Sequence, residues 1–203
     1  MEPASYGRFV VKNVRWCWVV EGRSGDFGKR WVTDTLAFKP YPCGTVAQPY
    51  IDCARRLAAQ GVKPDDVSDI VCEVAEGTVH RLWEPLADKQ RPPNGYAAKF
   101  AVPYLLATGF VHGSVGLGAF SESAIRDPRV LALAAKMTYT IDPQNPYPRS
   151  YTGHIRATMK DGRVIEERQP HLRGGAHEPM TRQDRRRQVC SQCRSWRLDR
   201  RAK

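Results

Sequence analysis

The chain has 203 residues, a mass of 22.9 kDa and a net charge of +11 at neutral pH. Hydrophobic residues make up 41% and charged residues 26%, which is typical of a globular protein and argues against wholesale disorder. No apolar run approaches the roughly 18 residues of a membrane span, and Met1 is not followed by the basic and apolar regions of a secretory signal, so neither segment is expected.

Most of the excess positive charge lies at one end of the chain. Residues 182–203 hold nine basic and two acidic side chains, a net charge of +7, while residues 1–181 hold 23 basic and 19 acidic ones, a net charge of +4. A protein that binds nucleic acid carries its basic residues on the folded face that docks. The overall charge is therefore a weak argument for such a partner, and no specific nucleic acid is expected.

The first part of the chain gives few structural signals. Short strands are possible at Phe9–Val11 and at Trp16–Val20, and a further strand is predicted at Trp31–Phe38, where polar and apolar residues alternate imperfectly. Residues 1–27 are interpreted as an irregular N-terminal segment.

Clearer elements follow. A helix is predicted at Pro49–Gln60, because apolar residues recur there at three- and four-residue spacing, and Gly61 supplies the stop. The segment Ile70–Ala75 alternates in the manner of a strand. The segment Trp83–Gly95 contains three prolines and is predicted to be a loop.

Two helices are predicted in the middle of the chain. Tyr96–Val111 is the most apolar helical segment, and Pro103 within it implies that the helix either begins near this proline or kinks there. Asp127 followed by Pro128 is typical of a helix start, and Val130–Lys136 would fill that helix.

The remaining elements predict the fold class. A strand is expected at Met137–Asp142, and Thr152–Met159 and Val164–Gln169 flank an Asp-Gly turn typical of a hairpin, with Ile155, Ala157 and Met159 facing the core. Strands of a hairpin pair antiparallel. The predicted fold is therefore α+β, with a mostly antiparallel sheet and helices packed on one of its faces.

The apolar periodicity ends at about Arg182, although Thr181 and Asp184 are able to open a helix. Residues 185–203 are interpreted as an irregular and disordered basic tail. Residues 28–184 are interpreted as a single α+β domain.

The cysteines and histidines predict no metal site. Four of the six cysteines stand alone, among apolar residues or in expected helices and strands, and are interpreted as small buried hydrophobes in a reducing compartment. Cys190 and Cys193 form a single CxxC motif, whereas zinc normally takes four ligands and no second pair follows. The five histidines are scattered without ligand spacing.

Two polar residues are candidates for contact with a ligand. Lys39 precedes the stiff turn of Pro40 and Pro42, so a short rigid backbone is able to hold its ammonium group toward an anion. A carboxylate close to an ammonium group gains several kcal/mol at an effective dielectric constant of ~20. Tyr104 lies on the apolar helix. The ordinary alternatives are a solvated lysine and a core tyrosine with a satisfied hydroxyl group.

The motif Lys39-Pro40-Tyr41-Pro42-Cys43, followed by Ile51-Asp52, resembles the K-x-Y-P-C…H-x-x-I-D signature of the MmgE/PrpD family. That family includes 2-methylcitrate dehydratases, cis-aconitate decarboxylases and iminodisuccinate epimerases. Other segments are similar to the family in the same order, from about Gly28 to Asp184. These are Ala98-Lys99-Phe100-Ala101-Val102-Pro103-Tyr104 with His112-Gly113, Asp127-Pro128-Arg129-Val130, the hairpin turn Lys160-Asp161-Gly162, and Arg173-Gly174-Gly175 to Pro179-Met180-Thr181.

The resemblance implies a chemistry and an architecture. Family members are more than twice as long as this chain, and their active site lies between a large helical domain, which supplies the acid and base, and a smaller α+β domain of the kind seen here. It implies metal-free proton abstraction next to a carboxylate of a small di- or tricarboxylic acid, with no cofactor. It also implies a homodimer in the cytoplasm, away from membranes, and a truncated chain that is inactive by itself.

The resemblance also assigns roles to three residues. Lys39 would bind or polarise a substrate carboxylate, and Tyr104 would donate a proton or a hydrogen bond at the reacting centre. Gln48 stands where the family has a histidine. Because glutamine does not titrate, Gln48 keeps at most a role in binding.

Two other functions remain open. One is a non-catalytic remnant or interaction module, which Gln48 and the missing helical domain favour. The other is nucleic-acid binding through the arginine-rich tail, which would be electrostatic and independent of sequence.

Overall fold

The computed structural model describes residues 9–11, 14–16, 29, 31 and 36–201. The chain forms two units, residues 1–36 and residues 37–203. In the first unit, strands β1 (Phe9–Val11) and β2 (Val14–Trp16) pair antiparallel. The strand predicted at Phe9–Val11 is confirmed, and the second strand starts at Val14. Residues 17–20 of the predicted strand lie outside the described residues.

The second unit is built on a four-stranded sheet in the order β4-β3-β5-β6. Strand β3 (Val67–Val74) pairs parallel with β4 (Met137–Ile141) and antiparallel with β5 (Gly153–Met159), and β5 pairs antiparallel with β6 (Val164–Gln169). Two of these three pairings are antiparallel. The prediction of a mostly antiparallel sheet is therefore confirmed.

The strands follow the alternation of their residues. In β3, Ile70, Cys72 and Val74 are fully buried, while the residues between them are half-buried. The hairpin predicted around Asp161-Gly162 joins β5 and β6, and Gly162 takes a φ of +85° at the turn. One face of the sheet is consequently apolar and must be buried against other elements.

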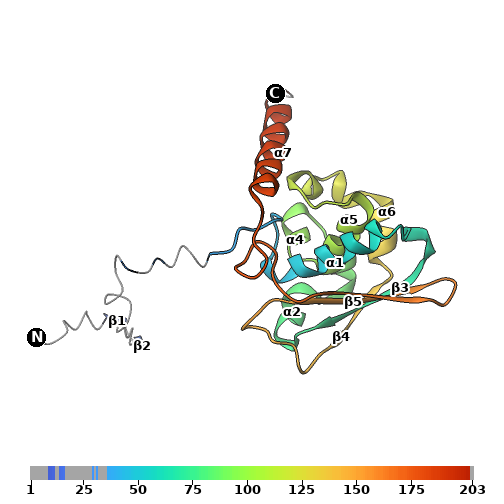
Figure 1. Ribbon diagram of the computed structural model, residues 1–203, viewed down its shortest axis with the longest axis horizontal. Helices are drawn as coiled ribbons and strands as arrows, with labels where there is room; N and C mark the ends of the chain where they lie inside the picture. The colour runs from blue at the N-terminus through green and yellow to red at the C-terminus, as the bar shows by residue number, and fades with distance from the viewer. Residues whose placement is uncertain (1–8, 12–13, 17–28, 30, 32–35, 202–203) are drawn as a thin grey trace, which may run out of the picture. The chain divides into compact units, whose positions relative to one another are not determined.

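Helices α1 (Gln48–Ala59), α5 (Val102–His112) and α6 (Pro128–Ala134) lie on this face (Figure 1). The predicted helices are confirmed, and α1 packs against both α5 and strand β5. A short helix α4 (Gly95–Ala98) precedes α5, which begins next to Pro103 rather than kinking there. Gly113 ends α5 with a φ of +67°.

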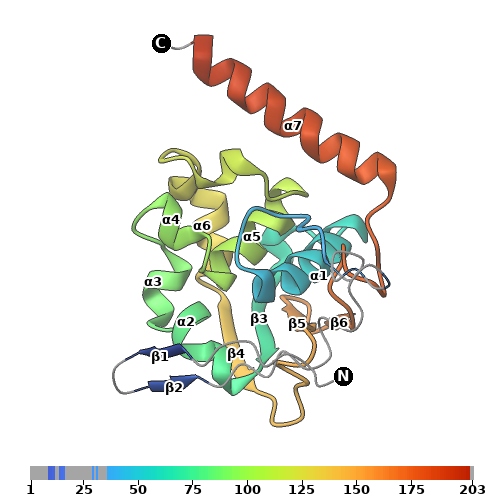
Figure 2. The ribbon, with the colours of Figure 1, turned by 90° about the vertical axis from the view of Figure 1, so that its left-hand side faces the viewer.

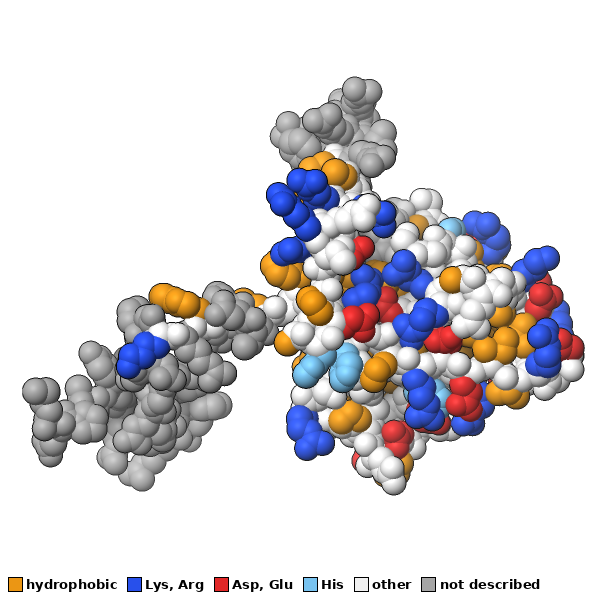
Figure 3. Space-filling model, in the orientation of Figure 1, with side chains coloured by type: hydrophobic (Ala, Val, Ile, Leu, Met, Phe, Trp, Pro, Cys, Tyr) orange, Lys and Arg blue, Asp and Glu red, His pale blue; other side chains and the backbone are white. Residues whose placement is uncertain are grey.

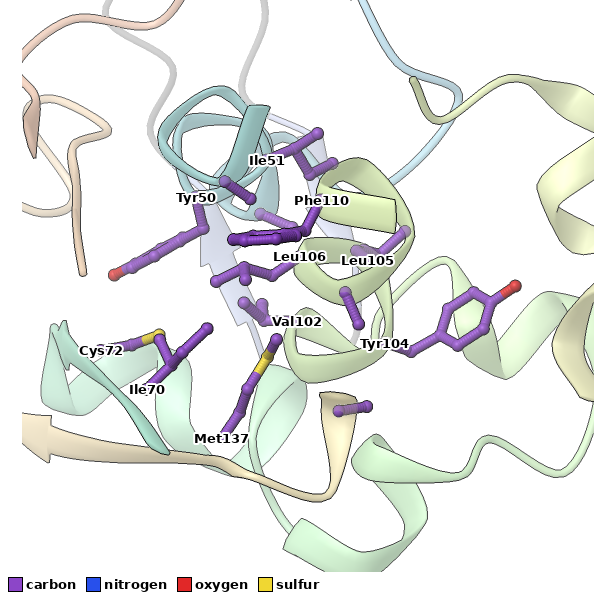
Figure 4. Packing of buried hydrophobic residues seen from close by; sticks show 14 of the residues in the cluster. Tyr50, Ile51, Ile70, Cys72, Val102, Tyr104, Leu105, Leu106, Phe110 and Met137 are labelled. Atoms are coloured by element: carbon purple, nitrogen blue, oxygen red, sulfur yellow. The ribbon is translucent and has the colours of Figure 1, made fainter. Parts of the chain in front are cut away.

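The hydrophobic core lies between the helices and the sheet (Figure 4). Trp83 is fully buried, and its ring lies 6.0 Å from that of Tyr50 and 5.4 Å from that of Tyr139. Ile155, Ala157 and Met159 of β5 are buried as predicted. Side chains from α1, α5 and the sheet thus share one core.

The segment predicted to be a loop at Trp83–Gly95 contains a helix, so that prediction is wrong. Helix α2 (Val79–Leu82) precedes it and helix α3 (Leu86–Gln90) lies inside it. Pro85 stands just before α3, where its missing N–H costs nothing, so the proline starts the helix instead of excluding one.

The segment after Thr181 also differs from expectation, because helix α7 (Arg182–Arg201) takes the place of an irregular tail. The hydroxyl of Thr181 accepts a hydrogen bond from the backbone N–H of Asp184 at 3.1 Å, and the carboxylate of Asp184 accepts one from the backbone N–H of Thr181 at 3.2 Å. This reciprocal cap starts the helix, which then projects from the body of the unit (Figures 1 and 2).

Leu36–Phe38 belongs to no strand, and residues 32–35 of that predicted strand lie outside the described residues. The backbone N–H of Phe38 instead donates to the carbonyl oxygen of Gly174 at 2.9 Å. The proposed boundaries at residues 27 and 184 stay predictions.

Candidate functional site

The turn that carries Lys39 is held from several sides. The Lys39 ammonium group donates to the carbonyl oxygen of Cys43 at 3.3 Å, which closes the turn formed by the two prolines. The side-chain amide of Gln188, on α7, donates to the carbonyl oxygen of Lys39 at 2.8 Å. The guanidinium of Arg185 lies 5.2 Å above the ring of Phe38. The backbone of Lys39 is therefore fixed, while its side chain is exposed.

Lys39 lines a cleft of about 340 Å³, here named the Lys39 cleft. Among the described residues that line it, two are cationic, four carry hydroxyl groups and none is acidic. The residues are Lys39, Gly44, Thr45, Val46, Gly77, Thr78, Arg81, Leu82, Phe100, Tyr147 and Tyr151. A cleft of this size and composition suits a small anionic ligand.

Arg81 is the second cation of the Lys39 cleft, and sequence reasoning missed it. Its guanidinium lies 5.4 Å from the ring centroid of Phe100, which holds it by a cation–π contact. The ammonium group of Lys89 donates hydrogen bonds to the carbonyl oxygen of Arg81 at 2.7 Å and to that of Phe100 at 3.3 Å, so it connects the two residues. Burial lowers the pKa of Lys89. No motif marks Arg81, because only the fold brings α2 next to the turn of Lys39.

The hydroxyl groups come from three parts of the chain. Thr45 precedes α1, Thr78 precedes α2, and Tyr147 and Tyr151 lie between β4 and β5, with their rings 6.0 Å apart. The hydroxyl of Thr78 donates to the carbonyl oxygen of Ala75 at 2.7 Å. The single O–H of Thr78 is thus already in use, and the hydroxyl groups of Thr45, Tyr147 and Tyr151 are the ones able to donate hydrogen bonds to a carboxylate beside the two cations.

Gln48 is fully buried at the start of α1 and is not among the residues that line the Lys39 cleft. Its amide nitrogen donates to the carbonyl oxygen of Tyr41 at 3.2 Å, and its amide oxygen has no hydrogen-bond partner among the described residues. In this conformation Gln48 stabilises the turn through its hydrogen bond to Tyr41.

Tyr104 is also buried, and it does not line the Lys39 cleft. In Figure 4 its ring extends from α5 away from Tyr50, Leu106 and Phe110. Its hydroxyl group donates to the carbonyl oxygen of Ala119 at 2.5 Å, and burial raises its pKa. A role in proton donation would require this hydroxyl group to exchange Ala119 for a ligand.

Beneath the turn lies a network around the buried carboxylate of Asp52, on α1. One oxygen of Asp52 accepts hydrogen bonds from the hydroxyl of Tyr41 at 2.6 Å and from Arg173 Nε at 3.0 Å. Arg55 Nη1 lies 3.6 Å from the same oxygen and donates to the Tyr41 hydroxyl at 2.9 Å. Burial, then the negative charge of Asp52, raise the pKa of Tyr41 to about 12. This network joins two motifs that are far apart in the sequence.

The described cysteines form two groups, one buried and one exposed to solvent. Cys43, Cys53 and Cys72 are buried, and burial raises the pKa of both Cys43 and Cys53 to about 12. A thiol with such a pKa is an inert core residue at neutral pH. Cys190 and Cys193 are exposed on α7.

Over the described part of the chain, no group of three His, Cys, Asp or Glu side chains is placed to hold a metal ion. His154 lies between two carboxylates, with Nδ1 2.5 Å from Glu73 and Nε2 3.2 Å from Glu166, on strands of the sheet. No helix within the described residues has the length and apolar character needed to cross a membrane.

Comparison with known proteins places the domain. The model of the MmgE/PrpD C-terminal domain matches residues 41–192, which include the Asp52 network and the first half of α7. The chain is 26% identical to the mitochondrial 2-methylcitrate dehydratase of Yarrowia lipolytica, over 68% of this chain and 28% of that protein. It is also 26% identical to the 2-methylcitrate dehydratase-like protein oryR of Aspergillus oryzae, over 75% of this chain and 33% of that protein. The chain thus spans about a third of these relatives, and it belongs to the MmgE/PrpD C-terminal domain family.

Proposed function

We propose that this chain supplies one wall of the active site of a lyase that acts on small di- or tricarboxylic acids by proton abstraction next to a carboxylate. The observation that carries the proposal is the composition of the Lys39 cleft. Lys39 and Arg81 lie there beside hydroxyl groups, and the described lining contains no acidic side chain. The names of the two relatives point to 2-methylcitrate as the substrate class.

Each residue has a role in this proposal. Lys39 binds a substrate carboxylate. Its ammonium group donates one hydrogen bond to the carbonyl oxygen of Cys43, and the side chain is otherwise exposed to a ligand. Tyr104 lies outside the lining of the Lys39 cleft, so its role as donor of a proton or a hydrogen bond requires its hydroxyl both to leave Ala119 and to move within reach of the acid bound there. Gln48 holds the turn in place and contributes to binding only indirectly.

The proposal also requires a second wall. The described lining of the Lys39 cleft contains no histidine, aspartate or glutamate, which are the usual groups for abstracting a proton near neutral pH. A general base must therefore come from another polypeptide segment. The chain's coverage of only 28% and 33% of its two relatives agrees with a missing wall.

Replacing Lys39 by Met is expected to weaken binding of 2-methylcitrate to the full chain about 10- to 100-fold, because a hydrogen bond to a charged group contributes about 1.5–3 kcal/mol. Isothermal titration calorimetry measures the change. The matched control is Lys63→Met, since Lys63 is exposed and also directly precedes a proline. Equal binding by the wild-type chain and Lys39→Met, or an equal loss in both variants, would contradict the proposal.

The purified chain is expected to convert neither 2-methylcitrate nor cis-aconitate by itself, because the described lining of the Lys39 cleft supplies no histidine, aspartate or glutamate to abstract the proton. Conversion is followed by the absorbance of the unsaturated acid. Addition of the helical part of a family member is expected to make conversion detectable. Conversion by the chain alone would overturn the requirement for a second wall.

A further inference from the structure

The turn at Lys39 separates two clefts. Lys39 lines the first, whereas Pro40, Tyr41 and Pro42 line a second cleft of about 330 Å³ between the body and α7. Its volume is close to that of the Lys39 cleft, and the two share no lining residue. Nothing in the proposed reaction uses this second space.

Three arginines from three separate segments line the second cleft, which we name the arginine cleft. They are Arg55 on α1, Arg173 after β6, and Arg187 on α7. In Figure 3 the Lys and Arg side chains gather where α7 meets the body. Like charges brought together at a concave surface raise the local concentration of anions.

Two of these arginines are oriented by the structure behind them. Arg55 donates from Nε to the carbonyl oxygen of Gly113 at 2.7 Å and from Nη1 to the Tyr41 hydroxyl. Arg173 donates from Nε to Asp52, and its guanidinium lies 5.2 Å above the Tyr41 ring. Each guanidinium group has five N–H donors in a fixed plane, so donors remain for a ligand while the plane is already set.

The third arginine has no such support. Arg187 makes no hydrogen bond or ion pair with any residue that the structure describes, and it is exposed on the face of α7 that lines the cleft. Asp184 is the acidic residue of the lining, and its carboxylate already accepts hydrogen bonds from the backbone N–H and the hydroxyl of Thr181. Even with the buried Asp52 included, the arginines outnumber the carboxylates by three to two.

We propose that the arginine cleft binds a small multivalent oxyanion, a ligand with phosphoryl or clustered carboxyl groups. Planar guanidinium forks match these groups, and the hydroxyls of Ser114 and Ser191 add further donors. The ligand bridges α7 to the body, because Arg187 comes from one side of the cleft and Arg55 and Arg173 come from the other.

The test compares two neighbouring arginines of α7 that carry the same charge. Arg187 lines the cleft and Arg186 does not, so Arg187→Gln and Arg186→Gln remove equal charge from the same exposed helix. The full chain is titrated with inorganic pyrophosphate at low ionic strength, and binding is measured by calorimetry. We expect Arg187→Gln to weaken binding at least about fivefold and Arg186→Gln to change it less than twofold. Absence of binding, or an equal loss in both variants, would overturn the proposal.

A second arm separates this site from the Lys39 cleft and identifies the kind of ligand. In the Lys39→Met background, both pyrophosphate and tricarballylate are titrated, the first for phosphoryl and the second for carboxyl groups. Binding of either probe that survives Lys39→Met and falls with Arg187→Gln supports the arginine cleft and names the ligand class. Loss of all binding with Lys39→Met would place the anion in the other cleft and reject the proposal.

Discussion

Replacement of Asp52 by Ala is expected to lower the free energy of unfolding by about 3–5 kcal/mol, the usual cost of breaking a buried ion pair from one side. The substitution leaves the half-buried guanidinium of Arg173 without its carboxylate and the hydroxyl of Tyr41 without an acceptor. Asp52 is only 5% exposed, so water cannot easily take its place. Urea unfolding followed by circular dichroism measures the loss.

Two further variants make this result interpretable. Asp52→Asn keeps the shape and one acceptor oxygen but removes the charge, and we expect a smaller loss of stability than with Ala. Arg163→Ala breaks the exposed pair with Asp161 at the hairpin turn but leaves the hydrogen bond from the backbone N–H of residue 163 to Asp161, and we expect its urea midpoint to stay close to that of the wild type. A midpoint for Asp52→Ala as high as that for Arg163→Ala would refute the structural role of the network.

Replacement of Gly174 by Ala is expected to be similarly damaging. Gly174 has a φ of +89°, where a side chain costs about 1–2 kcal/mol, and a Cβ atom at this position would overlap the carbonyl oxygen of Phe38. The clash pushes the backbone next to Lys39, so ligand binding at the Lys39 cleft should weaken together with stability. Urea unfolding and titration with 2-methylcitrate check both effects.

Gly61 provides the matched control, because its φ is +85° but no atom lies within 4 Å of the position that a Cβ atom would take. Gly61→Ala therefore carries the backbone strain without the clash. We expect Gly174→Ala to lose at least twice as much stability as Gly61→Ala, and only Gly174→Ala to change ligand binding. Equal effects in the two variants would show that the contact with Phe38 is unimportant.

Much of the fold could be predicted because local patterns specify it. The spacing of apolar residues defines α1, the Asp-Pro pair caps α6, and the Asp-Gly turn forms the β5–β6 hairpin. Helices α2 and α3 were missed because four or five residues are too few to display a period. The parallel pairing of β3 with β4 was not predicted, because the residues of a strand do not indicate which other strand it pairs with.

The candidate site was predictable only where a single segment carries it. The turn places Lys39 at a cleft, as its prolines suggest. Arg81, Tyr147 and Tyr151 come from segments far from Lys39 in the sequence, and only the folded domain brings them together. Tyr104 illustrates the converse, because a family motif identifies the residue but the burial of its hydroxyl group depends on the distant Ala119.

The parallel pair of β3 and β4 has a consequence for how the domain is assembled during synthesis. The segment that connects the two strands contains α2 to α6, so the sheet cannot gain this edge until that entire crossover has been made. The antiparallel partner β5 emerges later still. During synthesis, both edges of β3 therefore stay unpaired until β4 and β5 have been made, and an unpaired strand edge is a site at which chains can aggregate.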